Sequence, residues 1–480
     1  MSAPVIFEIT PDHRRVDIQV DEEDQTKRLV FIDNINSLTF ALWIGDLSGA
    51  KTRVDLPSDL SGCLWDRGWL VVKLRTSWDI GSATYNSGTL LGISFDKFLE
   101  GSRAFEVLFV PGPRRISSAQ FWAGGRLVVS VMENLVPSYM IFAPSNQEWT
   151  RELLGHMPNN GMFSVNVSRL DEDENESDGA LLVRIQDPLR PEHLLLTSVT
   201  STLPRSLKRA PAVFDSCGLI VSWHETLSTV GERIPYVQIG PQGESGNAPV
   251  YMTGYGGFNS FARPFEYRGG VGKMWLERGG TAVVAIIRGG GEFGPEWHEA
   301  GRREGKKLSH DDFAAVATDL VARKVTRPGR IAAEGSSNGG LLILNMLTRY
   351  PGLFGALNSN LPLADMWRYP KLLVGSLWIG EYGNPSEPAD WEFLQHISPY
   401  HNITTEGISP PILMMTTRRD DRVHPGHARK MTAMLQSFNR EAWFFELEAG
   451  GHGFGKSSRE RARFRALMYA FMRRSINWYP

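Results

Sequence analysis

The chain has 480 residues, of which 42% are hydrophobic and 22% are charged, and its formal net charge is -2. This length and composition are typical of a soluble globular protein of about two or three domains. The net charge gives no reason to expect nucleic acid or an acidic membrane surface as a partner. The two cysteines, Cys63 and Cys217, cannot build a disulfide framework or a zinc site. No signal-peptide pattern and no membrane-length apolar run is present, so we expect a cytoplasmic monomer or weak oligomer.

Residues 1–210 are expected to form an all-β domain. Short apolar runs recur between clusters of Gly, Pro, Asn and Asp, as in antiparallel hairpins. These runs lie at residues 28–33, 38–44, 69–74, 89–94, 104–110, 126–131, 139–142 and 180–185. Loose units of about 45–50 residues suit the blades of a β-propeller, of which about four would fit, and a β-sandwich gives a similar pattern. The acidic stretch at 171–178 is expected to be a solvated loop tip.

Residues 211–480 follow a different pattern, in which strands alternate with helices. The strands are predicted at 250–253, 282–287, 331–333, 411–416 and 443–447, and the helices at 311–325, 341–350 and 457–475. This alternation predicts an α/β domain with a mostly parallel sheet that is covered on both faces.

Residues 335–339 read Gly-Ser-Ser-Asn-Gly, a Gly-x-Ser-x-Gly frame between a predicted strand and a predicted helix. On such a sharp turn Ser337 is held in a strained, exposed position, and the flanking glycines avoid collisions with neighbouring backbone. The motif therefore predicts the nucleophile of an α/β-hydrolase, and a plain glycine-rich turn is the alternative.

A serine hydroxyl needs a histidine to take its proton and a carboxylate to orient that histidine. In this fold the partners follow in the order Ser, Asp or Glu, His. Asp420 and Asp421 both follow the strand at 411–416, and this reasoning does not choose between them. His452 lies in a Gly-Gly-His-Gly loop after the strand at 443–447, which lets an imidazole reach the serine.

Two other histidines, His424 and His427, lie too near the aspartates in sequence to face them across a site. The oxyanion hole of this fold uses the N–H of the residue after the nucleophile, here Asn338, and a donor from an earlier loop. Tyr255, flanked by glycines after the strand at 250–253, is a candidate for that second donor; a packed core tyrosine is the alternative.

Several of these stretches together resemble the catalytic domain of the prolyl oligopeptidase family of serine peptidases. They are Tyr-Gly-Gly-Phe-Asn at 255–259, Ile-Arg-Gly-Gly-Gly-Glu-Phe-Gly at 287–294 with Trp-His at 297–298, Gly-Ser-Ser-Asn-Gly-Gly-Leu at 335–341, Asp-Asp-Arg-Val at 420–423 and Gly-His-Gly at 451–453. The resemblance covers roughly residues 225–480. It implies that Asp420, and not Asp421, is the triad member.

The resemblance also implies the substrate-binding residues. Arg422 matches an arginine that binds a substrate carbonyl, and Trp378 matches an indole that stacks on a substrate proline. Phe258, Tyr382 and Val423 match further walls of that proline pocket. No metal or cofactor is implied.

Family members place a larger propeller and an N-terminal segment before the catalytic domain. Only residues 1–210 precede it here, so we expect the early blades to be missing. Together with this resemblance, the sequence predicts a serine oligopeptidase that hydrolyses short peptides on the carboxyl side of proline through an acyl-enzyme on Ser337. The alternatives are an esterase or a peptide macrocyclase with the same triad, or a truncated, catalytically idle interaction protein.

Overall fold

The computed structural model describes residues 5–479 except 21–27, 37, 146–148, 156, 158–160, 172–178, 202 and 244. The predicted acidic loop tip at 171–178 lies outside the described residues, apart from its first residue. None of the helices in the described part of the chain has the length and apolar character of a membrane span.

The first half of the chain, from β1 to β18 and called the β-sheet half below, forms four successive four-stranded antiparallel sheets. The first two sheets contain β1 (Arg15–Val20), β2 (Leu29–Asn34), β3 (Phe40–Gly45) and β4 (Lys51–Arg53), and then β5 (Gly62–Asp66), β6 (Trp69–Lys73), β9 (Leu90–Ser94) and β10 (Glu106–Phe109). In sequence, the short hairpin of β7 (Trp78–Ile80) and β8 (Ala83–Tyr85) lies between β6 and β9, and helix α1 (Phe95–Leu99) lies between β9 and β10. The last two sheets contain β11 (Arg115–Ala123), β12 (Arg126–Glu133), β13 (Val136–Ala143) and β14 (Thr150–Leu153), and then β15 (Ser164–Arg169), β16 (Ala180–Asp187), β17 (Arg190–Ser198) and β18 (Arg205–Arg209).

Each sheet of the β-sheet half packs on the next through its own apolar cluster. Leu42 and Leu91 belong to the cluster between the first and second sheets, Val71 and Leu127 to the next cluster, and the cluster that contains Leu181 joins the last two sheets. Such serial packing is that of neighbouring propeller blades, and it differs from the single interface of a two-sheet sandwich. The predicted all-β first part is therefore confirmed.

The second half, from β19 to α11 and called the hydrolase half below, is built on one eight-stranded sheet. In spatial order its strands are β19 (Leu219–Leu227), β20 (Arg233–Pro241), β22 (Thr281–Ala285), β21 (Val250–Thr253), β23 (Ile331–Ser336), β24 (Phe354–Asn360), β25 (Ile412–Thr417) and β26 (Ala442–Leu447). The pairs from β22 to β26 are parallel, and β19 and β20 are antiparallel additions.

Strands β22 and β25 are buried along their whole length, because helices cover both faces of the sheet. The helices are α3 (Gly269–Met274), α4 (Pro295–Glu299), α5 (Lys306–Ala322), α6 (Asn338–Arg349), α7 (Ile379–Tyr382), α8 (Pro388–Leu394), α9 (Pro399–Asn402), α10 (Gly426–Ser437) and α11 (Ser458–Ser475). This is the α/β-hydrolase fold, as predicted. Helix α6 begins three residues before the predicted start at 341, and its first turn contains Gly339 and Gly340, which fit closely against neighbouring backbone.

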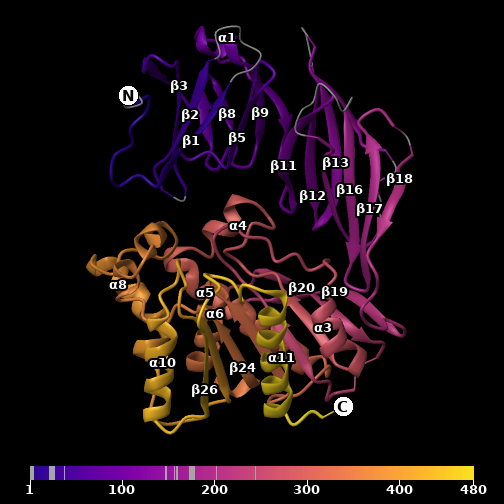
Figure 1. The fold of residues 1–480 in the computed structure, drawn as a ribbon, viewed down its shortest axis with the longest axis vertical. Helices are drawn as coiled ribbons and strands as arrows, with labels where there is room; N and C mark the ends of the chain where they lie inside the picture. Colours follow the sequence, from indigo (N-terminus) through magenta and orange to yellow (C-terminus); the bar gives the residue numbers. More distant parts are fainter. Residues whose placement is uncertain are drawn as a thin grey trace.

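The two halves face each other across the end of the sheet at which the parallel strands finish (Figure 1). Arg114 of the β-sheet half forms an ion pair with Glu225 on β19. The backbone N–H of Tyr267 donates to Gln186 Oε1 on β16 at 3.1 Å. Between the halves lies a cavity of about 980 Å³ that side chains from both of them line. In parallel sheets this edge is where ligands bind.

Candidate active site

Ser337 lies on the turn between β23 and α6 with a backbone φ of 59°, in the left-handed region that side chains rarely adopt. A Cβ atom at position 335 would lie 2.2 Å from the carbonyl oxygen of Gly339, so only glycine fits there. At position 339 the nearest atom, the carbonyl oxygen of Gly254, would be 3.2 Å away, which is tight without being prohibitive. The strained turn is therefore held by its surroundings, as a nucleophile elbow requires.

The Nδ1 atom of His452 lies 2.8 Å and 3.0 Å from the two carboxylate oxygens of Asp420. The Asp420 side chain is fully buried, and its Oδ1 atom also accepts the backbone N–H groups of Arg422 and Val423 at 2.9 Å each. These bonds fix the carboxylate and make Nδ1 the protonated ring nitrogen. The other nitrogen, Nε2, is then left to accept a proton.

Asp421 contributes in a way that the sequence analysis missed. Its Oδ1 atom accepts the backbone N–H of His452 at 3.0 Å, and the Thr417 hydroxyl donates to the carbonyl of Gly451. Together these bonds anchor the histidine loop to the end of β25. The sequence did hint at this second role, because Asp420 and Asp421 are adjacent and only one of them can orient the His452 ring.

The other two histidines of this region do not join the site. The Nδ1 atom of His427 accepts the backbone N–H groups of Ala364 and Asp365, at 3.3 Å and 3.2 Å. Burial lowers the pKa of His427 to about 4, so this ring is a neutral acceptor inside the fold. His424 bonds to the nearby backbone N–H of Gly426 at 3.0 Å.

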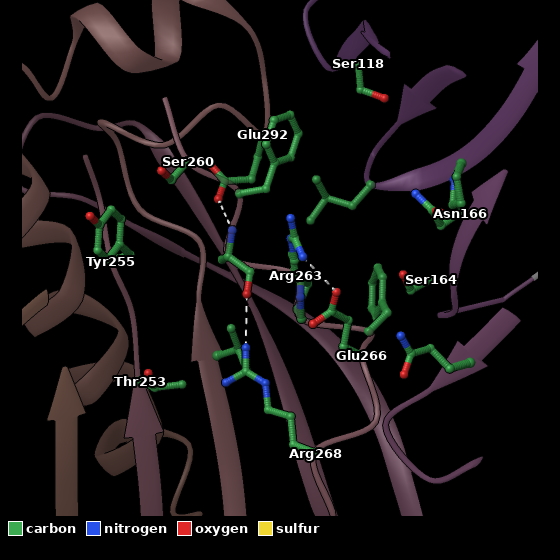
Figure 2. A pocket seen from close by; sticks show the side chains of 18 of the residues that line it. Ser118, Ser164, Asn166, Thr253, Tyr255, Ser260, Arg263, Glu266, Arg268 and Glu292 are labelled. Carbon is green, nitrogen blue, oxygen red and sulfur yellow. Dashed lines mark hydrogen bonds and ion pairs between the residues drawn. The ribbon is translucent and has the colours of Figure 1, made fainter. Parts of the chain in front are cut away.

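Ser337 and His452 line the same cavity, together with Tyr255 and Arg422. Within the described residues no hydrogen bond joins the Ser337 hydroxyl to the His452 ring. Such bonds often form only when substrate is bound. Figure 2 shows Tyr255 at this cavity, with Thr253 at the end of β21 and Ser118, Ser164 and Asn166 on strands of the β-sheet half.

Tyr255 is only partly buried, so it is not a packed core tyrosine. Its carbonyl oxygen accepts a hydrogen bond of 2.6 Å from Asn338 Nδ2, and Asn338 Oδ1 in turn accepts one of 2.9 Å from the Tyr382 hydroxyl. Burial raises the pKa of Tyr255, while the adjacent Ser337 side chain and Arg422 lower it. The phenol thus keeps its proton at neutral pH and lies beside the serine as a donor.

The residues that the family resemblance assigned to a proline pocket lie in one apolar cluster. The Phe258 ring lies edge-on to Trp378 and Tyr382, at centroid distances of 6.4 Å and 5.6 Å. Tyr382 and Val423 are buried, whereas Phe258 and Trp378 keep part of their surface exposed. The structure brings all four together beside the Tyr255 loop, but they are not among the residues that line the large cavity.

Two buried acidic groups hold the glycine-rich stretch at 287–294. Arg288 donates to both oxygens of Asp312, at 2.8 Å and 2.5 Å. Glu292 Oε1 accepts the backbone N–H of Ala262 at 2.7 Å, and its Oε2 atom has no partner in the described part of the chain. Burial raises the pKa of Glu292 to about 7.

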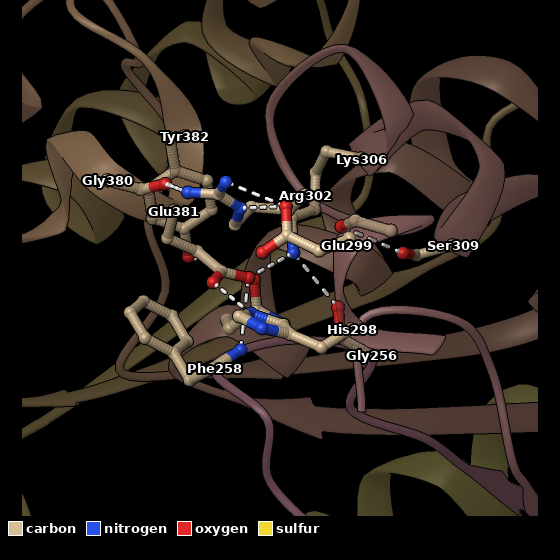
Figure 3. Close-up of polar contacts among 12 residues, drawn as sticks. Gly256, Phe258, His298, Glu299, Arg302, Lys306, Ser309, Gly380, Glu381 and Tyr382 are labelled. Carbon is tan, nitrogen blue, oxygen red and sulfur yellow. Dashed lines mark hydrogen bonds and ion pairs between the residues drawn. The ribbon is translucent and has the colours of Figure 1, made fainter. Parts of the chain in front are cut away.

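Glu381 and Lys306, called the clamp below, hold the loop that carries Tyr255 through its backbone at Gly256 and Phe258 (Figure 3). Glu381 Oε1 accepts the backbone N–H of Phe258 at 3.0 Å and the Lys306 Nζ at 2.6 Å. The same ammonium group donates to the carbonyl oxygen of Gly256 at 3.1 Å. The sequence contains one hint of these contacts, which is the acidic residue Glu381 directly before Tyr382.

An eight-stranded sheet with a serine on a strained strand-to-helix turn, and a His–Asp pair after its last strands, defines a serine hydrolase of the α/β-hydrolase class. Residues 270–478 match the family model described as the prolyl oligopeptidase family. The chain belongs to this family of serine peptidases.

Relatives and solved structures agree with that assignment. The chain is 32% identical over 427 residues to an uncharacterized peptidase of Sinorhizobium fredii, a match that covers 88% of this chain and 58% of the relative. It is 40% identical over 237 residues to a dual function macrocyclase-peptidase of Amanita bisporigera, covering 48% of this chain and 32% of the relative. The structure of a post-proline cleaving enzyme from Rickettsia typhi superposes with a TM-score of 0.91 at 26% identity, over 98% of this chain and 69% of the other. The chain thus spans 58% of the Sinorhizobium relative and about a third of the Amanita one.

Proposed function

We propose that this protein is a serine oligopeptidase that hydrolyses short peptides on the carboxyl side of proline. Ser337 Oγ attacks the scissile carbonyl, and His452 takes the serine proton and passes it to the leaving amine. Water then hydrolyses the acyl-enzyme with the same histidine as base. Asp420 keeps the imidazole in the required tautomer, and the Asn338 N–H and the Tyr255 hydroxyl donate to the oxyanion.

The observation that carries this proposal is the His452–Asp420 pair, with an Nδ1 to Oδ2 distance of 2.8 Å, beside the cavity that Ser337 lines. A cavity of about 980 Å³ is large enough for a short peptide and too small for a folded protein.

The proline preference is supported by the cluster of Phe258, Trp378, Tyr382 and Val423. A flat apolar surface suits a pyrrolidine ring and offers no counter-charge for Lys or Arg at the same subsite. Arg422 lies at the cavity next to this cluster, where its guanidinium can donate to a substrate carbonyl. The similar structure from Rickettsia typhi is that of a post-proline cleaving enzyme, which agrees with this preference.

Chromogenic dipeptide substrates that differ only in the residue before the scissile bond test the proposal. We expect kcat/KM to be at least roughly tenfold higher for proline than for alanine, and no cleavage after lysine. Ser337→Ala, made in the same chain, should abolish turnover. Equal rates for the three substrates, or full activity of Ser337→Ala, would contradict it.

A macrocyclase is the second candidate, because the Amanita relative is a dual function macrocyclase-peptidase. The same acyl-enzyme gives a ring when the amino end of the peptide attacks in place of water. Mass spectrometry of products from a long proline-containing peptide separates the two outcomes, because ring closure adds no water. An esterase would cleave ester substrates alone, and an idle protein would leave a fluorophosphonate probe unreacted. The cytoplasmic location stays a prediction.

A further inference from the structure

The clamp on the Tyr255 loop is linked to the β-sheet half through the side chains of His298 and Arg75. Glu381 Oε2 lies 2.8 Å from His298 Nε2, and His298 Nδ1 lies 3.2 Å from Nη1 of Arg75. Arg75 follows β6, so it reaches the network from the other half of the molecule. It also lies 3.7 Å from Glu299 on α4.

The chemistry of these groups fixes the direction of each hydrogen bond. A guanidinium can only donate, so His298 Nδ1 accepts from Arg75 and Nε2 carries the proton that is donated to Glu381. His298 and Lys306 are fully buried and Glu381 is 2% exposed, so each bond acts with little competition from water. Removal of Arg75 would leave a buried ring nitrogen unpaired and free the imidazole to change tautomer.

Glu381 and Lys306 in turn hold the backbone on both sides of Tyr255. The carboxylate accepts the Phe258 N–H, and the ammonium donates to the Gly256 carbonyl. Burial alone would raise the pKa of Glu381, but Lys306 and His298 outweigh it and lower that pKa to about 2. Glu381 is therefore ionised throughout the neutral range, and a shift of this carboxylate would move the loop.

We infer that Arg75 is a positioning residue, which acts through His298 and Glu381 to make the placement of the Tyr255 hydroxyl depend on the seating of the β-sheet half. This rests on the proposed role of Tyr255 at the oxyanion. When the halves separate, His298 loses its donor, and the Glu381 carboxylate that holds the loop with Tyr255 and Phe258 is positioned less firmly. Full reactivity of Ser337 is thus confined to the closed molecule.

The test is a double-mutant cycle in the full chain, read as the rate constant for labelling of Ser337 by a fluorophosphonate. This readout needs no proline-specific substrate. Arg75→Met should lower the labelling rate roughly tenfold in the wild-type background. In a Tyr255→Phe background it should lower the rate by less than about twofold, because the hydroxyl that Arg75 positions is already absent. Additive losses in the two backgrounds would overturn the inference.

Arg114→Met is the matched control, because it removes another ion pair between the halves that ends on Glu225 of β19, away from the loop. Its labelling rate should stay within about twofold of the wild type. A loss equal to that of Arg75→Met would show that seating of the halves acts by some other route, and would overturn the role of Arg75.

His298→Gln gives a second variant should Arg75→Met fold poorly. The amide keeps a donor for Glu381 and an acceptor for Arg75, so it should retain most of the labelling rate, whereas His298→Leu should lose as much as Arg75→Met. Equal rates for the two His298 variants would contradict the coupling. Wild-type protein that is labelled at Ser337 but does not cleave after proline would refute the proposed specificity and leave this test intact.

Discussion

Asp421 holds the backbone of His452 through a hydrogen bond of 3.0 Å to its N–H, while the neighbouring Asp420 binds the ring of the same residue. The two carboxylates diverge because the Asp420 side chain is buried under the turn at 420–423, whereas Asp421 is exposed and faces the loop. The histidine is thereby fixed in both position and tautomer. Because the two aspartates have different roles, the same isosteric substitution, Asp to Asn, should have different effects at the two positions.

Asp420→Asn is expected to lower kcat roughly 10⁴-fold, because the amide would donate to Nδ1 and impose the wrong tautomer. Asp421→Asn should stay within about threefold of the wild type, since its amide oxygen still accepts the backbone N–H. Steady-state rates on a proline substrate check both. Comparable losses in the two variants would mean that the roles are not divided in this way.

Tyr255→Phe removes one oxyanion donor and leaves the ring in place. We expect kcat to fall by roughly 100- to 1000-fold with little change in KM, because the hydroxyl acts mainly in the transition state. A rise in KM with kcat unchanged would assign Tyr255 to substrate binding.

The catalytic constellation could be predicted because each of its parts has a strong local pattern. The elbow frame around Ser337, the glycine-flanked His452 and the apolar runs before them all follow from turn chemistry and strand periodicity. The choice between Asp420 and Asp421 did not follow from these patterns, and it depended on the family resemblance. Both lie at the end of one strand, and only the folded loop decides which carboxylate meets the ring.

The clamp and its link to Arg75 could not be predicted, because their members are far apart in the sequence. Arg75 and His298 are separated by 223 positions, and Glu381 and Lys306 by 75. The Arg75–His298 contact forms only after the two halves have docked, and the Lys306–Glu381 pair only after the hydrolase half has folded. In the sequence alone a lone Arg, His or Lys is most often a solvated side chain.

Trp378→Ala is expected to reduce the preference for proline over alanine roughly tenfold, since the variant loses the flat surface against which a pyrrolidine ring packs. The loss should fall on kcat/KM for the proline substrate, with the alanine substrate nearly unaffected. Trp443→Ala, at an exposed indole on β26, is the matched control. An unchanged preference for proline in Trp378→Ala would show that the Trp378 indole is not part of the specificity pocket.

Glu292→Gln should change how stability depends on pH. Burial raises the pKa of Glu292 from 4.5 to about 7, so the folded protein keeps a proton that the unfolded chain loses. The stability that this group contributes is complete below pH 4.5, falls as the pH rises to about 7, and is constant above that. The shift corresponds to a loss on the order of 3 kcal/mol across this window.

The Gln side chain of this variant cannot ionise, yet its amide oxygen can still accept the Ala262 N–H. The variant should therefore not lose stability as the pH rises through this window. Denaturant unfolding at pH 4.5, 6 and 8 measures the difference between wild type and variant at each pH. We expect the free energy of unfolding of Glu292→Gln to increase relative to that of the wild type as the pH rises. Glu392→Gln, at an exposed position on α8, should show the same pH dependence as the wild type. A constant difference across the three pH values would mean that Glu292 is already ionised in the folded protein at neutral pH.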